Sequence, residues 1–102
     1  MEFQLVIQLL EEPYNDIDLI ADLEDKLEGS LIDAEVDGHD IGNGEVNIFI
    51  HTNTPADILK RVKSILEEEC FDLAHVKIAY RKFDAENYLP LWPDNLVEFE
   101  VK

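Results

Sequence analysis

Basic residues are scarce in this chain. Its 102 residues include 8 Lys and Arg against 24 Asp and Glu, and the formal net charge is −16. Nucleic acids and anionic lipid surfaces are bound through basic faces, so this balance argues against direct binding to either. A net charge of this size keeps a chain soluble by self-repulsion. A basic protein is the macromolecular partner that such a chain can attract.

Cysteine and long apolar runs are nearly absent as well. The lone Cys70 excludes an internal disulfide and fits a cytoplasmic protein. We expect Cys70 to be a small buried hydrophobe at the end of a helix stripe. No apolar run approaches the ~20 residues of a membrane span. The first ten residues lack the basic start and the cleavage site of a signal peptide, so we expect a cytoplasmic protein away from membranes.

Hydrophobic periodicity predicts the secondary structure. Hydrophobic residues make up 46% of the chain, which is enough for one core in a single domain, 1–102. Apolar and polar residues alternate in four stretches, and this period of two predicts strands. Helical spacing predicts a first helix capped by Asn15 and stopped by Gly29, and a second helix that begins at Pro55. The four predicted strands are 3–10, 32–37, 45–52 and 73–81.

The order of these elements predicts an α+β fold. Strand, helix, strand, strand, helix, strand is the order of a ferredoxin-like βαββαβ sandwich, an antiparallel sheet of order 4-1-3-2 with two helices on one face. Residues 1–83 form this core, and 84–102 form a C-terminal tail in which 96–101 alternates like a fifth strand. We expect the following residues to form the core: Leu5, Ile7, Ile20, Leu23, Val46, Ile48, Ile50, Val62, Ile65, Val76 and Ile78.

A glycine-rich segment, 38–44, joins the second and third predicted strands. Its glycines and its Asn-Gly pair supply the positive φ angles that a chain reversal needs, and we expect Gly42 or Gly44 to have one. The segment is longer than a two-residue turn, so we also expect a β-bulge.

One face of the predicted sheet carries no helix. Val6, Phe49 and Ala79 form its small apolar middle. We expect the tail to cover part of this face, because Trp92 and Phe99 need a place to be buried. A homodimer contact is the alternative explanation.

Acidic residues gather between positions 11 and 45. This stretch holds thirteen carboxylates and one base, Lys26, for a net charge of −12. The second predicted strand has a carboxylate at every outward position, and two more lie near the hairpin tip. A solvated surface is one interpretation, and a docking face for a basic protein is the other. The predicted partner-binding residues are Asp33, Glu35, Asp37, Asp40 and Glu45.

We predict no catalytic residue, metal ligand or cofactor. Asp37, His39 and Asp40 are a candidate metal site, but neither a His-x₃-His spacing nor a cysteine pair supports it. The glycine-rich segment lacks the Lys and Ser/Thr of a phosphate loop. An isomerase-like enzyme that uses His51 with Asp33 or Glu35 remains a third-ranked alternative.

The hairpin D-G-H-D-I-G-N-G-E-V-N-I-F-I-H-T, from Asp37 to Thr52, resembles that of a family of small acidic bacterial proteins without an established activity. The A-Y-R of the fourth strand and the L-W-P of the tail also match. Size, acidity and predicted fold are similar to those of immunity proteins, which neutralise bacterial toxins. These resemblances imply a non-enzymatic inhibitor of a basic protein. A small regulatory ligand-binding domain that acts as a homodimer is the alternative.

Overall fold

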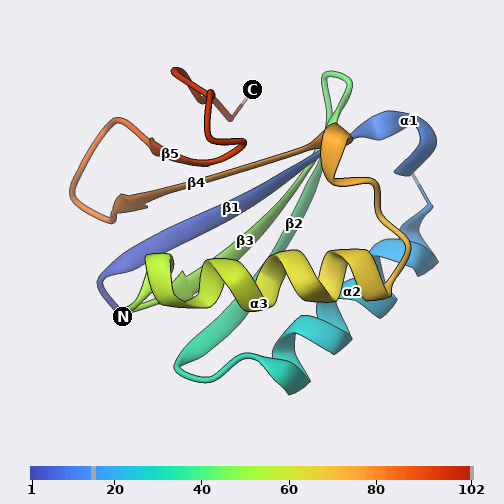
Figure 1. Ribbon diagram of the computed structural model, residues 1–102, viewed down its shortest axis with the longest axis horizontal. Helices are drawn as coiled ribbons and strands as arrows, with labels where there is room; N and C mark the ends of the chain where they lie inside the picture. The colour runs from blue at the N-terminus through green and yellow to red at the C-terminus, as the bar shows by residue number, and fades with distance from the viewer. Residues whose placement is uncertain (15, 102) are drawn as a thin grey trace.

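A five-stranded antiparallel sheet forms the centre of the computed structural model, which describes residues 1–14 and 16–101 (Figure 1). With three helices, this is an α+β arrangement. The strands are β1 (Phe3–Leu10), β2 (Ala34–Gly42), β3 (Glu45–Thr52), β4 (Val76–Lys82) and β5 (Leu89–Trp92). The helices are α1 (Glu11–Tyr14), α2 (Ile17–Ser30) and α3 (Pro55–Glu68), and a short 3-10 helix, η1 (Leu73–His75), precedes β4.

The strand order is β2-β3-β1-β4-β5, and each neighbouring pair is antiparallel. The order β4-β1-β3-β2 lies within it. The sheet nevertheless differs from the expected four-stranded one, because β5 pairs with the free edge of β4. The element order also differs, since α1 and η1 are added to the predicted helices.

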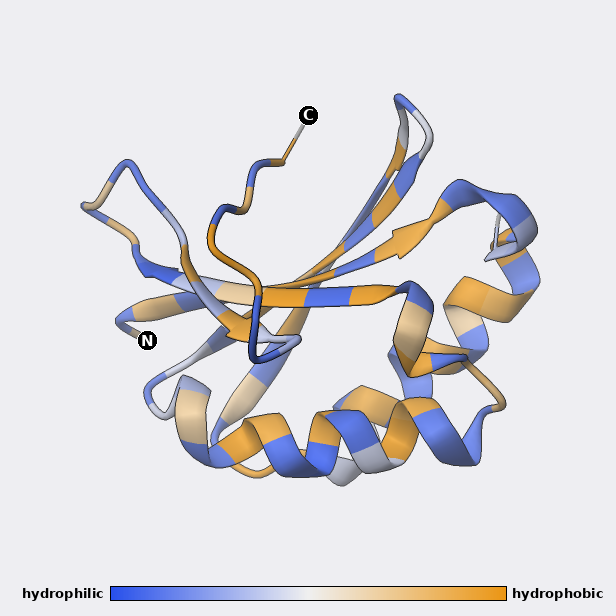
Figure 2. Cartoon of the chain, turned by 45° about the horizontal axis from the view of Figure 1, so that its top comes forward, coloured by the Kyte–Doolittle hydropathy of each residue, from blue (hydrophilic) through white to orange (hydrophobic). Residues whose placement is uncertain are grey.

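Helices α2 and α3 cover one face of the sheet, and the hydrophobic core lies between the two layers (Figure 2). Side chains alternate between the faces of a strand, so Leu5, Ile7 and Leu9 of β1 all face these helices. All eleven residues that the sequence predicted for the core are buried, none more than 2% exposed. Among the described residues, no helix has the length and apolar content to cross a bilayer.

The ends of the helices differ in part from the prediction. The carboxylate of Asp16 caps α2 by accepting the Asp18 N–H at 2.9 Å, while Asn15 lies outside the described residues. Helix α2 continues through Gly29 to Ser30. Helix α3 begins as predicted, with Pro55 in its first turn, although the Thr54 hydroxyl makes no capping hydrogen bond.

Cys70 is exposed, so the prediction that it is buried was wrong. Helix α3 ends two residues earlier, and Cys70 has a φ of 66°, in the left-handed region. The chain therefore reverses at Cys70, and the Phe71 N–H donates to the Leu66 carbonyl oxygen at 2.8 Å. The reversal buries the Phe71 ring in the core instead of the thiol.

The β2–β3 hairpin has a shorter loop than predicted. Strand β2 continues to Gly42, and only Asn43 and Gly44 form the turn, with φ angles of 53° and 81°. These two positive φ angles suit the twist of a tight hairpin. The expected bulge is present, but it lies inside β2, between Val36 and Gly38. At its other end β2 begins at Ala34, later than predicted, since Asp33 has a φ of 58°.

The fifth strand lies earlier in the tail than predicted. Leu89–Trp92 pairs with β4, whereas 96–101 has no strand hydrogen bonding and crosses the sheet face that lacks helices. Trp92 is half-buried against the helix-side core, with the Lys63 ammonium 3.8 Å from its ring centroid. Of the two tail aromatics expected on the other face, only Phe99 packs there.

Gly44→Val tests the turn. Valine is strained at the positive φ of this position, so we expect a loss of about 1–3 kcal/mol in the free energy of unfolding. Gly42→Val is the matched control, because Gly42 has no positive φ and no atom within 4 Å of an added Cβ. Urea denaturation of both variants measures the difference. Equal losses would show that the turn conformation is misassigned.

Candidate functional site

The sheet face that lacks helices is partly covered by the tail of the same chain. Val6 and Ala79 are fully buried there, and Phe99 packs on them at 9% exposure. The Gln8 side-chain amide fixes the tail by donating to the Glu100 carbonyl oxygen at 2.8 Å. The prediction that the tail covers this face is confirmed for Phe99.

A hollow of about 310 Å³ lies between α2 and the edge strand β2. Four carboxylates line it, together with Val36 and Gly38, and none of the lining residues is a lysine or an arginine. We call these four residues the acidic corner: Glu24, Asp25, Glu28 and Asp37.

The fold holds the helical part of the acidic corner in place. Glu24 and Glu28 are one turn apart on α2 and therefore share a face. The Val36 N–H of β2 donates to Glu28 Oε2 at 2.7 Å. Glu24 Oε1 lies 2.8 Å from His39 Nδ1, and the Glu24 side chain is only 17% exposed. Two of the four carboxylates are thus tied to β2.

The β-bulge positions the fourth carboxylate. Asp37 is the extra residue between Val36 and Gly38, so its side chain departs from the regular alternation of the strand. It remains 57% exposed, and its Oδ2 lies 3.6 Å from Nε2 of His51 on β3. Asp37 is therefore free to meet a partner from the solvent side.

The structure separates the residues of the candidate metal site. His39 faces α2 and contacts Glu24, whereas Asp37 contacts His51. Among the described residues, no three histidine, cysteine or acidic side chains are grouped so that they could hold a metal ion. His51 Nε2 lies 3.6 Å from Asp37 Oδ2, and the His51 ring packs edge-on against Phe83. Glu35, which the enzyme hypothesis paired with His51, is opposite it in the β2–β3 ladder but makes no ion pair with it among the described residues.

The five predicted partner-binding residues are dispersed. Only Asp37 lines the acidic corner. Asp33 lies outside the strand, while Glu35 and Asp40 are exposed on β2. Glu45 lines hollows on the sheet face together with Gln8 and Lys77.

Sequence reasoning missed Glu24, Asp25 and Glu28 as site residues. Their spacing on a predicted helix was a usable signal, because residues four apart face the same way. What the spacing alone does not give is the strand that this helix lies against. In the structure α2 packs beside β2, and its carboxylates meet the bulge there.

Comparison with protein-family models, curated proteins and solved structures found no match to this chain.

Glu28→Ala tests how the acidic corner is held. It removes the acceptor of the Val36 N–H. We therefore expect Glu28→Ala to have a free energy of unfolding about 1 kcal/mol lower than that of Asp25→Ala. Asp25→Ala is the matched control, because it removes the same charge from the same helix. Hydrogen exchange at the Val36 amide should be faster only in Glu28→Ala. Equal exchange in both variants would show that this hydrogen bond does not form in solution.

Proposed function

We propose that this protein is a non-enzymatic cytoplasmic module that binds a basic protein at the acidic corner. The observation that carries the proposal is the hollow between α2 and β2, which four carboxylates line without a lysine or arginine. The surrounding stretch, 11–45, has a net charge of −12. The resemblance to immunity proteins supports an inhibitory role, in which the bound partner is a basic toxin.

For the fold we propose a ferredoxin-like βαββαβ core in residues 1–83, extended by the tail, 84–102. The order β4-β1-β3-β2 within the sheet supports it, as do the two long helices on one face. The hairpin from Asp37 to Thr52 supports kinship with the small acidic bacterial proteins that it resembles.

An arginine or lysine side chain of the partner is the group that fits the acidic corner. A guanidinium donates in a fixed fork that matches carboxylates, and such charge-assisted hydrogen bonds are stronger than neutral ones. Glu24 and Glu28 are already oriented by His39 and Val36, so less side-chain freedom is lost when the partner binds. Asp25 and Asp37, which are also exposed, complete the contact.

The partner is bound by side chains and not by strand addition. Strand β2 is an edge strand, and such edges can pair with a further strand. Here the Val36 N–H is already bonded to Glu28, and the bulge at Asp37 interrupts the regular ladder. Asp33, Glu35 and Asp40 extend the negative field along this edge, which mainly speeds association.

A paired charge-neutralising experiment tests the proposal. Asp25→Asn with Asp37→Asn removes two charges from the acidic corner, while Asp84→Asn with Glu86→Gln removes two exposed charges from the β4–β5 loop. The probe is an oligoarginine peptide, and association is measured at several salt concentrations. We expect the corner variant to associate about tenfold more slowly at low salt, with a flatter salt dependence. The loop variant should keep nearly the original rate.

The same two variants are then used as baits in a lysate of the source cell. A basic protein should be captured by the original chain and the loop variant and lost by the corner variant. If both variants slow oligoarginine association equally, only net charge matters, and the acidic corner is a solvated surface.

A further inference from the structure

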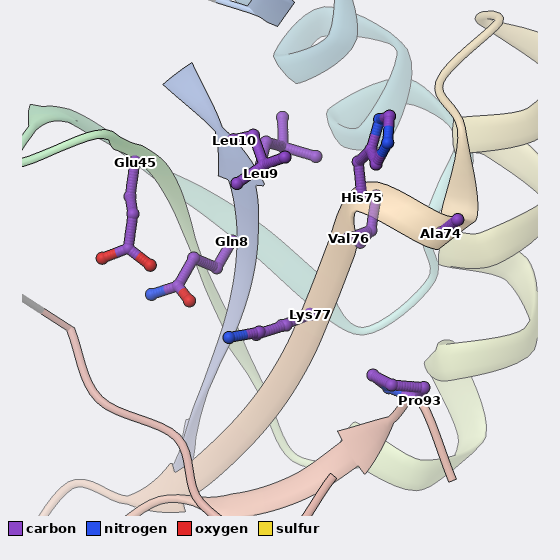
Figure 3. A pocket seen from close by; sticks show the side chains of 9 residues that line it. All are labelled: Gln8, Leu9, Leu10, Glu45, Ala74, His75, Val76, Lys77 and Pro93. Atoms are coloured by element: carbon purple, nitrogen blue, oxygen red, sulfur yellow. The ribbon is translucent and has the colours of Figure 1, made fainter. Parts of the chain in front are cut away.

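A second cavity, of about 150 Å³, lies on the sheet near the ends of β1, β3 and β4 (Figure 3). Its lining combines an acid, a base, an amide and the imidazole of His75 with apolar groups. Figure 3 shows Gln8, Glu45 and Lys77 extending toward the same side of the sheet. Leu10 and Pro93 supply apolar surface, and Leu10 is 46% exposed although it is a large hydrophobic residue.

Glu45, which lines this cavity, has an unmet hydrogen-bonding requirement. Its Oε1 is buried and has no hydrogen-bond partner among the described residues. Leaving such an atom unpaired is unfavourable, and more so when the group is charged. The carboxylate therefore favours a donor that enters from outside the chain.

The neighbouring side chains do not supply that donor. Gln8 Nε2 carries two hydrogens, and it donates to Asn47 Oδ1 at 3.0 Å and to the Glu100 carbonyl oxygen at 2.8 Å. Lys77 is exposed, and no ion pair between it and Glu45 is among those of the described residues. The cavity thus presents an unpaired acid and an accessible base, separated by an amide that is already engaged.

The size and charges of the cavity define the ligand. A volume of 150 Å³ equals about five waters at ~30 Å³ each, well below the ~300 Å³ or more of pockets for drug-sized molecules. A simple cation would be attracted by Glu45 but repelled by Lys77. A simple anion would be attracted by Lys77 but repelled by Glu45. A molecule with both charges satisfies both residues, and a short aliphatic group can pack on Leu10 and Pro93.

We propose that this cavity binds a small zwitterion of the aliphatic α-amino acid class. The ligand's ammonium group lies on Glu45, and its carboxylate faces Lys77. This site does not involve any residue of the acidic corner. Its test is therefore independent of the test of the proposed protein-binding function. It gives the alternative of a regulatory ligand-binding domain a specific location.

Three probes that share a branched isopropyl group test the charge requirement. L-valine carries both charges, isobutylamine lacks its carboxylate, and isovalerate lacks its ammonium group. In NMR titrations of the full chain, L-valine should shift the backbone amide signals of Gln8, Glu45 and Lys77. Each of the other two probes should bind at least about tenfold more weakly, since each loses one charged contact. Equal binding of all three, or no shift with any, overturns the proposal.

Two substitutions and a control place the ligand. Glu45→Gln and Lys77→Met should each weaken L-valine binding about tenfold. Glu98→Gln removes the same charge as Glu45→Gln from a residue that lines only the adjoining hollow, and it should leave binding unchanged. If Glu45→Gln proves unstable, Lys77→Met and the three-probe comparison decide the question. Unchanged binding in Lys77→Met, or equal losses in Glu45→Gln and Glu98→Gln, contradicts the assignment.

Discussion

The two-sided burial of β1 is the constraint on which the rest of the structure depends. This strand lies between β3 and β4, and residues 5–9 are all buried, so both of its faces are covered. Leu5, Ile7 and Leu9 require the helical layer, while Val6 requires cover on the opposite face. Because burying apolar area is the main favourable term in folding, a sheet with such a central strand needs a cover on each side. Helices α2 and α3 supply one cover, and Phe99 of the tail supplies the other.

The tail covers only part of the helix-free face, so the edges of the sheet and the uncovered end of this face remain for interaction with other molecules. At the β2 edge the chain combines a bulge, a side-chain acceptor on a strand N–H and a row of carboxylates. Such features also keep the edge strands of different molecules from pairing. Exposed carboxylates on β2 therefore serve two purposes, because they oppose aggregation and they attract a basic partner. Glu45 differs from the other hairpin acids, because its side chain lies over the sheet beside Gln8 and Lys77. The hairpin therefore contributes to two separate regions of negative charge.

Sequence periodicity was sufficient for the core and for the facing of β1, β3 and β4, since each of these strands alternates without interruption. It failed where the backbone departs from regular geometry. The bulge at Asp37 changes which residues of β2 share a face. His39 therefore contacts Glu24 of α2, and it is not grouped with Asp37 and Asp40 as the candidate metal site required. The positive φ of Cys70 reverses the chain there, so the Phe71 ring is buried in the core and the Cys70 thiol is not.

The acidic corner depends on how α2 lies against β2, and a pattern within one segment contains no information about such contacts. The alternation of 96–101 was misread for a similar reason, because a segment lying on a sheet face can alternate like a strand.

Contacts between the Phe99 ring and the Val6 and Ala79 methyl groups test the central claim, that the chain covers its own sheet. The measurement is an isotope-filtered NOE experiment on an equal mixture of labelled and unlabelled protein, which separates contacts within one chain from contacts between two. The structure predicts NOEs from Phe99 to both methyl-bearing residues within the labelled chain alone. NOEs between labelled and unlabelled chains would instead show that a second copy covers this face. The absence of any such NOE would show that the face is open and available for binding.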